Sequence, residues 1–408
     1  MLGVEGCAVC SYAGEASGRY LSWFALEAHA DPVTFSRLCA SLGMCPGHTR
    51  ALIRQPGAAR RLTPVYWHIM RTVPDRLGAR RPSLASCPAC KHDQAAARRA
   101  VEMVADWLAG DEQDGPARTA LSRLCLPHVR VIATTAGPRA SGQLLQVSAE
   151  HAAAKPASIE QLAGGPDHDA AGRARLLAAL PMADDPSVWT CRICLVGARA
   201  EVTSLTAAAA ADITGAADMA GSAGEYLCPP HFRDTMAMHP ECTSRLLAVQ
   251  QARQNEELRR LAARPPWRYP RRLGRRGARR MPGSCPACQA GHLAMQTELE
   301  RQRILLSSRV PGPPDAQGFC AQHVLSLQAG APAAGHIAAT QATERARSLT
   351  AELAEAFGKN TWTRRHEPKG PETTAWLRAA AFLDGRVFGG GPPPEPYGAG
   401  AEPEVRLW

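Results

Sequence analysis

Aromatic residues, long apolar runs and a secretory leader are scarce or missing in this sequence. Phe, Trp and Tyr make up only 5% of the 408 residues, which favours small, Ala-lined helical modules over one large core. No uninterrupted apolar run reaches the roughly 18 residues that a membrane-spanning helix needs. The start, Met1 to Cys7, has neither the basic nor the apolar region of a secretory signal. We therefore expect a cytoplasmic protein without a membrane partner.

Catalytic signatures are missing as well. The sequence contains no Gly-rich phosphate loop, no Gly-x-Ser-x-Gly nucleophile elbow and no His-Glu-x2-His motif. Several histidines form no acid–base or ligand spacing, among them His29, His68, His92, His151 and His366. These observations argue against an enzyme, and no catalytic residue is predicted.

Twelve of the fourteen cysteines, in contrast, follow a strict repeat. Four Cys-x2-Cys pairs alternate along the chain with four Cys-x2-His pairs, and the two kinds of pair are separated by 31 to 34 residues within each repeat. In a reducing cytoplasm such cysteines bind metal rather than form disulfides, and a disulfide framework leaves the four regularly placed histidines unexplained. The repeat therefore predicts metal sites.

Three thiolates and one imidazole at this spacing are the ligand set of a closed tetrahedral zinc site. We predict four such sites, one for each set of consecutive pairs: Cys7, Cys10, Cys45 and His48; Cys87, Cys90, Cys125 and His128; Cys191, Cys194, Cys228 and His231; and Cys285, Cys288, Cys320 and His323. Four protein ligands leave no position for a substrate, so four structural Zn²⁺ ions per chain are expected. Iron–sulfur clusters are the alternative cofactor. Cys39 and Cys242 lie outside the sets and are predicted to be buried thiols rather than nucleophiles.

Helical periodicity accompanies the metal pairs. The strongest amphipathic pattern is formed by Leu62, Val65, Tyr66, Ile69, Met70 and Val73. Thr63-Pro64 predicts the start of that helix, because a capping residue there precedes Pro at the first helical position. A last helix is predicted around Trp376 to Leu383, ending at Gly385. Each Cys-x2-His pair should also open a helix, with Pro46, Pro127, Pro229 and Pro230 in the first turns.

The linkers repeat too, since Pro-x-Arg-Leu-Gly followed by arginines begins at Pro74 and again at Pro270. The predicted fold is all-α, with four small zinc-clasped helical modules arranged as a duplicated pair. The predicted boundaries are residues 1–82 for zinc module 1, 83–163 for zinc module 2, 164–186 for a linker, 187–258 for zinc module 3, 259–283 for a basic linker, 284–386 for zinc module 4 with C-terminal helices, and 387–408 for a disordered tail.

Positive charge is concentrated in one segment. Arg259 to Arg280 holds ten arginines and no acid, which matches the whole formal net charge of +10. This segment could contact the phosphates of a nucleic acid non-specifically, with Trp267 and Tyr269 available for base stacking. The other interpretation is a solvated linker. Nucleic-acid binding is therefore kept as an alternative function.

The repeated knuckles, together with His366-Glu367-Pro368-Lys369-Gly370 before Trp376, resemble an uncharacterised bacterial family of helical proteins, a domain of unknown function. The resemblance implies a helical fold and bound metal, and it carries over no catalytic residue. We predict a zinc-binding, non-enzymatic interaction or regulatory scaffold with a protein partner. The alternatives are a nucleic-acid-binding protein and an iron–sulfur redox or accessory enzyme.

Overall fold

The computed structural model describes residues 7–27, 31–55, 57–79, 85–110, 121–154, 191–210, 227–263, 285–308 and 318–385. Within these ranges every regular element is a helix, which confirms the all-α class. The predicted linker 164–186 and the predicted tail 387–408 lie outside the described residues, as does most of the basic linker.

The helices fall into two halves of similar order. The first half, residues 7–154, contains α1 (Ala8–Leu26), α2 (Pro32–Ala40), α3 (Pro46–Ile53), α4 (Ala58–Gly78), α5 (Pro88–Ala109), α7 (Leu126–Thr135) and α8 (Pro138–Ala154). The second half, residues 191–385, contains α11 (Arg192–Ala210), α12 (Pro229–Met238), α13 (Thr243–Ala263), α14 (Pro286–Ser307), α15 (Ala321–Gly330), α16 (Pro332–Lys359) and α17 (Ala375–Asp384). Short 3₁₀ turns at Pro240–Cys242 and Pro371–Thr374 precede α13 and α17.

Four pairs of corresponding helices have matching lengths, whereas α8 has 17 residues and its counterpart α16 has 28. The pair α1 and α11 has 19 residues each, α4 and α13 have 21, α5 and α14 have 22, and α7 and α15 have 10. Together with the shared order of the cysteine pairs, these lengths confirm the predicted duplication.

Each half is built on two long antiparallel helices. In the first half α1 packs along α5, and the ring of Tyr20 stacks on that of His92 at 4.3 Å. In the second half α11 packs along α14 at two glycines. A Cβ at Gly197 would lie 2.4 Å from Met295 Cγ, and one at Gly291 would lie 2.6 Å from Glu201 Cγ. Because no other residue fits at these two positions without displacing a neighbour, they allow the close approach of the two helices.

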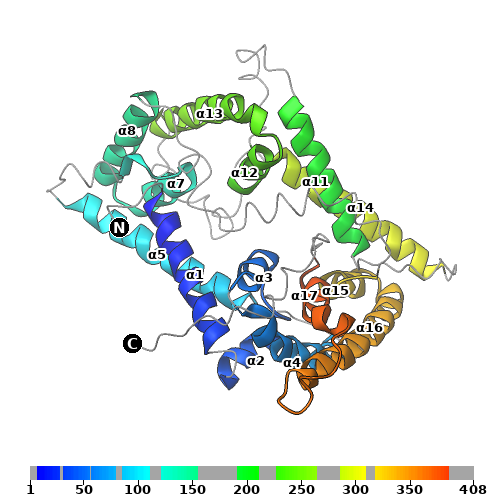
Figure 1. Cartoon of the computed structure of the whole chain (residues 1–408). Coiled ribbons are helices and arrows are strands. Elements are labelled where there is room, and N and C mark those ends of the chain that lie inside the picture. The colour runs from blue at the N-terminus through cyan, green and yellow to red at the C-terminus, as the bar shows by residue number, and fades with distance from the viewer. Residues whose placement is uncertain are drawn as a thin grey trace, which may run out of the picture.

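The halves join twice, in a reciprocal way. Helix α4 of the first half packs on α16 of the second, and α13 of the second half packs on α8 of the first, so the helices run round a closed circuit (Figure 1). At the larger junction Ile69 and Met70 share one core with Leu349 and Leu353, and all four are at most 1% exposed. This confirms that the amphipathic face predicted on α4 is a packing surface.

The predicted start of α4 is wrong. The helix begins at Ala58, after Gly57 in the left-handed region with φ 70°, so Thr63 and Pro64 lie inside it. Proline inside a helix removes one backbone hydrogen bond. Leu62 is fully buried on the same face as Val65 and Ile69, and this burial favours continuing the helix through the proline.

The predicted last helix is confirmed as α17. Trp376 and Leu383 are buried, and the helix ends at Gly385, whose φ of 76° is left-handed. A Cβ at Gly385 would also lie 2.5 Å from Cys320 Sγ and 2.8 Å from Cys194 Sγ. Glycine is thus required there both by its backbone conformation and by the sulfur atoms beside it.

Among the described helices, only α11 is long and apolar enough to cross a membrane by length and composition. Its 18-residue window has a mean hydropathy of 1.3. In this fold α11 begins directly after Cys191 and packs along α14 through Gly197, so it is one of the paired long helices.

Candidate metal centres

All eight cysteine pairs lie at the beginning of a helix. The first cysteine of each pair directly precedes the helix, and the second ligand lies in its first turn. The partial positive charge at a helix N-terminus stabilises a thiolate there. The prediction that each Cys-x2-His pair opens a helix is confirmed, and Pro46, Pro127, Pro229 and Pro230 lie in first turns as expected.

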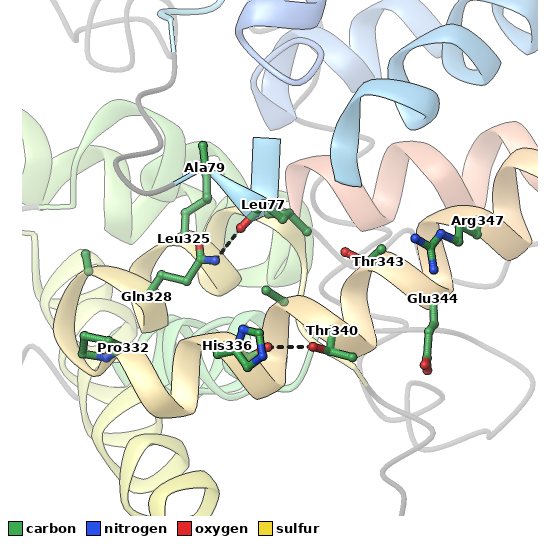
Figure 2. A pocket seen from close by; sticks show the side chains of 13 residues that line it. Leu77, Ala79, Leu325, Gln328, Pro332, His336, Thr340, Thr343, Glu344 and Arg347 are labelled. Atoms are coloured by element: carbon green, nitrogen blue, oxygen red, sulfur yellow. Dashed lines mark hydrogen bonds between the residues drawn. The ribbon is translucent and has the colours of Figure 1, made fainter. Parts of the chain in front are cut away.

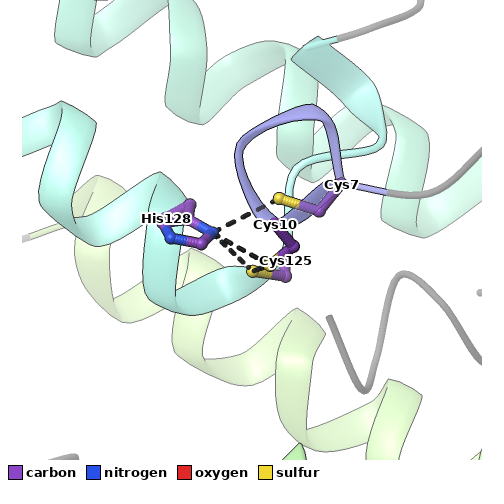
Figure 3. Close-up of side chains that lie close together, drawn as sticks. All are labelled: Cys7, Cys10, Cys125 and His128. Atoms are coloured by element: carbon purple, nitrogen blue, oxygen red, sulfur yellow. Dashed lines mark hydrogen bonds between the residues drawn. The ribbon is translucent and has the colours of Figure 1, made fainter. Parts of the chain in front are cut away.

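The sixteen predicted ligand residues gather in four clusters that could hold a metal ion. Cluster A contains Cys7, Cys10, Cys125 and His128; cluster B contains Cys45, His48, Cys87 and Cys90; cluster C contains Cys191, Cys194, Cys320 and His323; and cluster D contains Cys228, His231, Cys285 and Cys288. In each cluster the four ligand atoms lie within 4.8 Å of one another. Figure 3 shows cluster A, in which His128 from α7 faces Cys7 and Cys10 at the start of α1.

The predicted grouping of these residues is wrong. No cluster combines a Cys-x2-Cys pair with the Cys-x2-His pair that follows it. The Cys-x2-Cys pair at Cys7 joins the Cys-x2-His pair at Cys125, and the Cys-x2-His pair at Cys45 joins the Cys-x2-Cys pair at Cys87. The second half repeats this interlaced arrangement.

The physical reason for the interlacing is the length of the paired helices. At 1.5 Å per residue, α1 spans about 28 Å and carries the chain away from Cys7 before Cys45 is reached. Helix α5 starts beside Cys45 and runs back antiparallel to α1. The pair at Cys125, which follows α5, therefore returns to Cys7.

The histidines of all four clusters present Nδ1 to the sulfur atoms. In cluster A, Nδ1 of His128 lies 3.3 Å from the Sγ atoms of Cys7 and Cys10 and 3.1 Å from that of Cys125. In clusters B, C and D the Nδ1 to Sγ contacts range from 3.2 to 3.7 Å. The close Sγ pairs of the four clusters are 3.5 to 3.9 Å apart. The four clusters thus share one geometry.

One thiol in each cluster is strongly acidic. Hydrogen bonds from Cys10 and Cys125 hold the pKa of Cys7 far below its ordinary value. Although burial lowers the pKa of His128, its hydrogen bonds with Cys10 and Cys7 raise it to about 10. Hydrogen bonds from Cys45 and Cys90 likewise lower the pKa of Cys87 to about 3.

The acidic thiol is the leading cysteine of the Cys-x2-Cys pair in clusters C and D as well. The pKa of Cys191 is lowered despite burial, because Cys194 and Cys320 donate to it, and the pKa of Cys285 is lowered by Cys228 and Cys288. Each cluster therefore concentrates negative charge on sulfur at one point. A cation at that point would replace the shared protons, so metal binding would release protons.

Sequence reasoning missed one residue of cluster D. Oε2 of Glu201, on α11, lies 3.6 Å from Nε2 of His231. A carboxylate on the outer nitrogen orients a metal-binding imidazole and makes the ligand more basic. Burial lowers the pKa of His231, but hydrogen bonds with Cys285, Cys288 and Glu201 raise it to about 12. Glu201 has no ligand spacing of its own, so no signal in the sequence marked it.

The two cysteines outside the predicted sets join none of the clusters. Cys39 is buried, and burial raises the pKa of its thiol. Cys242 is half-buried, and its Sγ donates to the carbonyl oxygen of Ala209 at 3.4 Å. The prediction of a buried thiol is confirmed for Cys39. For Cys242 it is met only in part, because this side chain is half-buried.

A separate pocket of about 770 Å³ lies where the halves meet. Figure 2 shows its wall on α16, which carries His336, Thr340 and Arg347, while Nε2 of Gln328 donates to the carbonyl oxygen of Leu77 at 2.6 Å. None of the sixteen cluster residues lines this pocket. It is thus separate from the four metal clusters.

Only the beginning of the basic segment is described. Arg259 and Arg260 lie near the end of α13 and form ion pairs with Glu256 at 3.0 and 3.1 Å. The other eight arginines of the segment lie outside the described residues. The predicted nucleic-acid contact therefore stays a prediction.

The clusters define the class of this protein as a helical, duplicated chain with four Cys3His clusters at paired helix N-termini. No protein-family model matches the chain, and no curated protein or solved structure matches it either. The resemblance to uncharacterised bacterial helical proteins stays a prediction. Function has to be inferred from the clusters themselves.

Proposed function

We propose that the protein binds four Zn²⁺ ions, one in each cluster, and uses them to hold a helical interaction or regulatory scaffold. The observation that supports this most directly is the spacing of the ligand atoms. With Zn–S of about 2.3 Å and Zn–N of about 2.0 Å, a tetrahedral site has S···S edges of about 3.8 Å and S···N edges of about 3.5 Å. The clusters have Sγ pairs at 3.5 to 3.9 Å, and cluster A has Nδ1 to Sγ contacts at 3.1 to 3.3 Å.

The same spacing favours a single ion over an iron–sulfur cluster. The protein ligands of such a cluster bind different irons, so they lie farther apart than ligands of one ion. Here the four ligand atoms of each site lie within 4.8 Å of one another. Three sulfurs and one nitrogen also suit Zn²⁺, which accepts any mixture of thiolate and imidazole in a tetrahedron.

A structural role follows from the closed ligand sets. Each cluster joins two helix beginnings, such as those of α1 and α7 in cluster A. Structural zinc has an apparent binding free energy of about 10–16 kcal/mol. This is comparable to the entire stability of a typical domain, about 5–15 kcal/mol. Because the cores of the modules contain few aromatic residues, zinc is proposed to contribute a large part of the free energy of folding.

A protein partner is proposed because aromatic side chains are exposed on α16 and in the segment that follows it. Trp67 on α4 stacks with the partly exposed Phe357 on α16 at 6.1 Å. Trp362 is 74% exposed, with the guanidinium of Arg365 3.4 Å above its ring. Exposed Trp, together with Arg, is typical of protein-binding hot spots. Without a partner to cover them, these aromatic side chains would stabilise the fold more if they were buried in its core.

The proposal is tested by the metal content of protein purified under reducing, anaerobic conditions. We expect four zinc ions per chain, and X-ray absorption at the zinc edge should give an average shell of three sulfurs and one nitrogen. Two or fewer tightly bound metals would contradict the proposal. Strong visible absorption with bound iron would instead support iron–sulfur chemistry.

A further inference from the structure

The four clusters differ in how well their sulfur atoms are covered. In cluster C, Cys191 and Cys320 are at most 2% exposed, and α17 with Gly385 lies against the sulfurs. In cluster D, Cys228 is half-buried and Cys288 is exposed. All fourteen cysteines lie in the described part of the chain, and Cys288 is the exposed one among them. Cluster D therefore presents a ligand sulfur to solvent.

Cluster B, the counterpart of cluster D in the first half, has no exposed cysteine and differs in the residues beside it. Beside cluster B the ring of Tyr20 stacks on that of His92 at 4.3 Å, and Cys90, the equivalent of Cys288, is half-buried. Aligning the equally long helices of the two halves places Ser204 and Ala290 at the positions of the two rings. Cluster D lacks the corresponding pair of rings.

We propose that cluster D is an oxidation site for peroxides, at which Cys288 reacts first and forms a disulfide with Cys228. This inference rests on the proposed function, because the site is taken to hold zinc. The Cys288 thiolate attacks one peroxide oxygen, the O–O bond breaks, and a sulfenic acid forms as hydroxide leaves. The Cys228 thiolate then attacks that sulfur, the S–O bond breaks, and a second hydroxide leaves. Two thiolates lose two electrons, and the peroxide gains them.

The geometry brings the two sulfurs close enough for the second step. The Sγ atoms of Cys228 and Cys288 are 3.7 Å apart. A disulfide requires about 2.05 Å, so the sulfurs must approach by about 1.7 Å. Once two of its four ligands are joined to each other, the site cannot hold Zn²⁺ as a closed tetrahedron, and the ion is released.

The release has a defined structural consequence. Cluster D fixes the start of α12 against the start of α14, and α12 leads through one 3₁₀ turn into α13. Helix α13 forms the smaller of the two junctions between the halves by packing on α8. Loss of the ion should therefore loosen α12 and α13, while α4 and its junction with α16 keep their packing. Oxidation would therefore weaken the junction between α13 and α8 and leave the junction between α4 and α16 intact.

The test uses the zinc-loaded full-length protein and hydrogen peroxide as the probe. We expect release of one zinc ion per chain, loss of two of the fourteen thiols and a disulfide that peptide mapping assigns to Cys228 and Cys288. Amide hydrogen exchange should rise in residues 229–263 and stay unchanged in residues 58–78. Addition of a dithiol reductant and zinc should reverse these changes.

Two matched variants separate oxidation from simple loss of the site. Cys288→His keeps four ligands, since Cys2His2 sets also bind zinc, and should retain all four ions after peroxide treatment. Cys90→His, the equivalent change in cluster B, should still release one ion from cluster D. Equal release from all clusters, or a first disulfide in cluster A, B or C, would overturn the inference while leaving the zinc proposal intact. A purified protein without zinc would instead contradict the proposed function.

Discussion

Replacing His128 with alanine distinguishes the interlaced grouping from the sequential one. In the interlaced fold, His128 shares cluster A with Cys7, Cys10 and Cys125. In a sequential grouping its partners would be Cys87, Cys90 and Cys125. The variant removes three Nδ1 to Sγ contacts of 3.1 to 3.3 Å in cluster A and none elsewhere. The two groupings therefore predict different free thiols.

The expected size of the effect follows from the ligand set. Loss of the only nitrogen ligand should lower the zinc content from four to three ions per chain. The binding free energy lost with this ion is at most that of a whole structural zinc site, about 10–16 kcal/mol. Most of it is local, because cluster A joins only the beginnings of α1 and α7.

The assay is native alkylation with N-ethylmaleimide, read by peptide mass spectrometry at early times. Cys288 is exposed and gives the background that every variant shares. In His128→Ala we expect fast labelling of Cys7, Cys10 and Cys125. Fast labelling of Cys87 and Cys90 would refute the interlaced grouping.

The matched control is His48→Ala, which removes the histidine of cluster B. It should free Cys45, Cys87 and Cys90 and leave Cys7 protected. Opposite labelling patterns in the two variants would establish that consecutive pairs of ligands belong to different metal sites. Identical patterns would mean that one lost ion unfolds the whole half.

Three further changes test other parts of the molecule. Removal of zinc with a strong chelator should abolish most of the helical circular-dichroism signal and the cooperative melt; full retention of both would make the metal peripheral. Gly385→Val should lower the zinc content by one ion, because its Cβ would lie 2.5 Å from Cys320 Sγ and its φ of 76° disfavours a branched residue; four retained ions would contradict this. Any binding of nucleic acid through Arg259 to Arg280 should weaken steeply with salt and show little sequence preference; selective binding in high salt would place recognition elsewhere.

The sequence contained nearly all the local information needed for this fold. The period of Leu62, Val65, Ile69 and Met70 predicted a buried helical face, and the structure buries all four. The cysteine and histidine spacing marked all sixteen cluster residues. Local patterns succeed here because helix faces and helix starts depend on residues within a few positions of one another.

The grouping of the ligands could not be read from spacing alone. A Cys-x2-His pair fits either neighbouring Cys-x2-Cys pair equally well, because all pairs present the same atoms. One indirect signal was present. A helix that begins directly after Cys7 and continues to Leu26 moves the chain about 28 Å away from its own start. Glu201 is different, since its place beside His231 depends on the packing of α11 against α14 and α12.

The interlacing also predicts which parts of the chain can be separated. Clusters A and B use only first-half residues, and clusters C and D use only second-half residues. No described cluster spans the two halves, so a cut between residues 163 and 187 removes no ligand. Separate chains of residues 1–163 and 187–408 should each bind two zinc ions.

Each separate half would nevertheless expose an apolar helix face. In the intact circuit Leu62, Ile69, Met70 and Val73 are at most 1% exposed, and α16 provides much of the surface against which α4 packs. Full burial of such a side chain contributes about 1.5–3 kcal/mol, so the four together contribute at most about 6–12 kcal/mol. We therefore expect the two chains, when co-expressed, to form a one-to-one complex with four zinc ions. Leu349→Asp in the second chain should prevent this by placing a charge in the junction core, whereas Gln341→Asp at an exposed position of α16 should not. Two stable monomers from the unmutated chains would show that the junctions contribute little and that the zinc ions alone maintain each half.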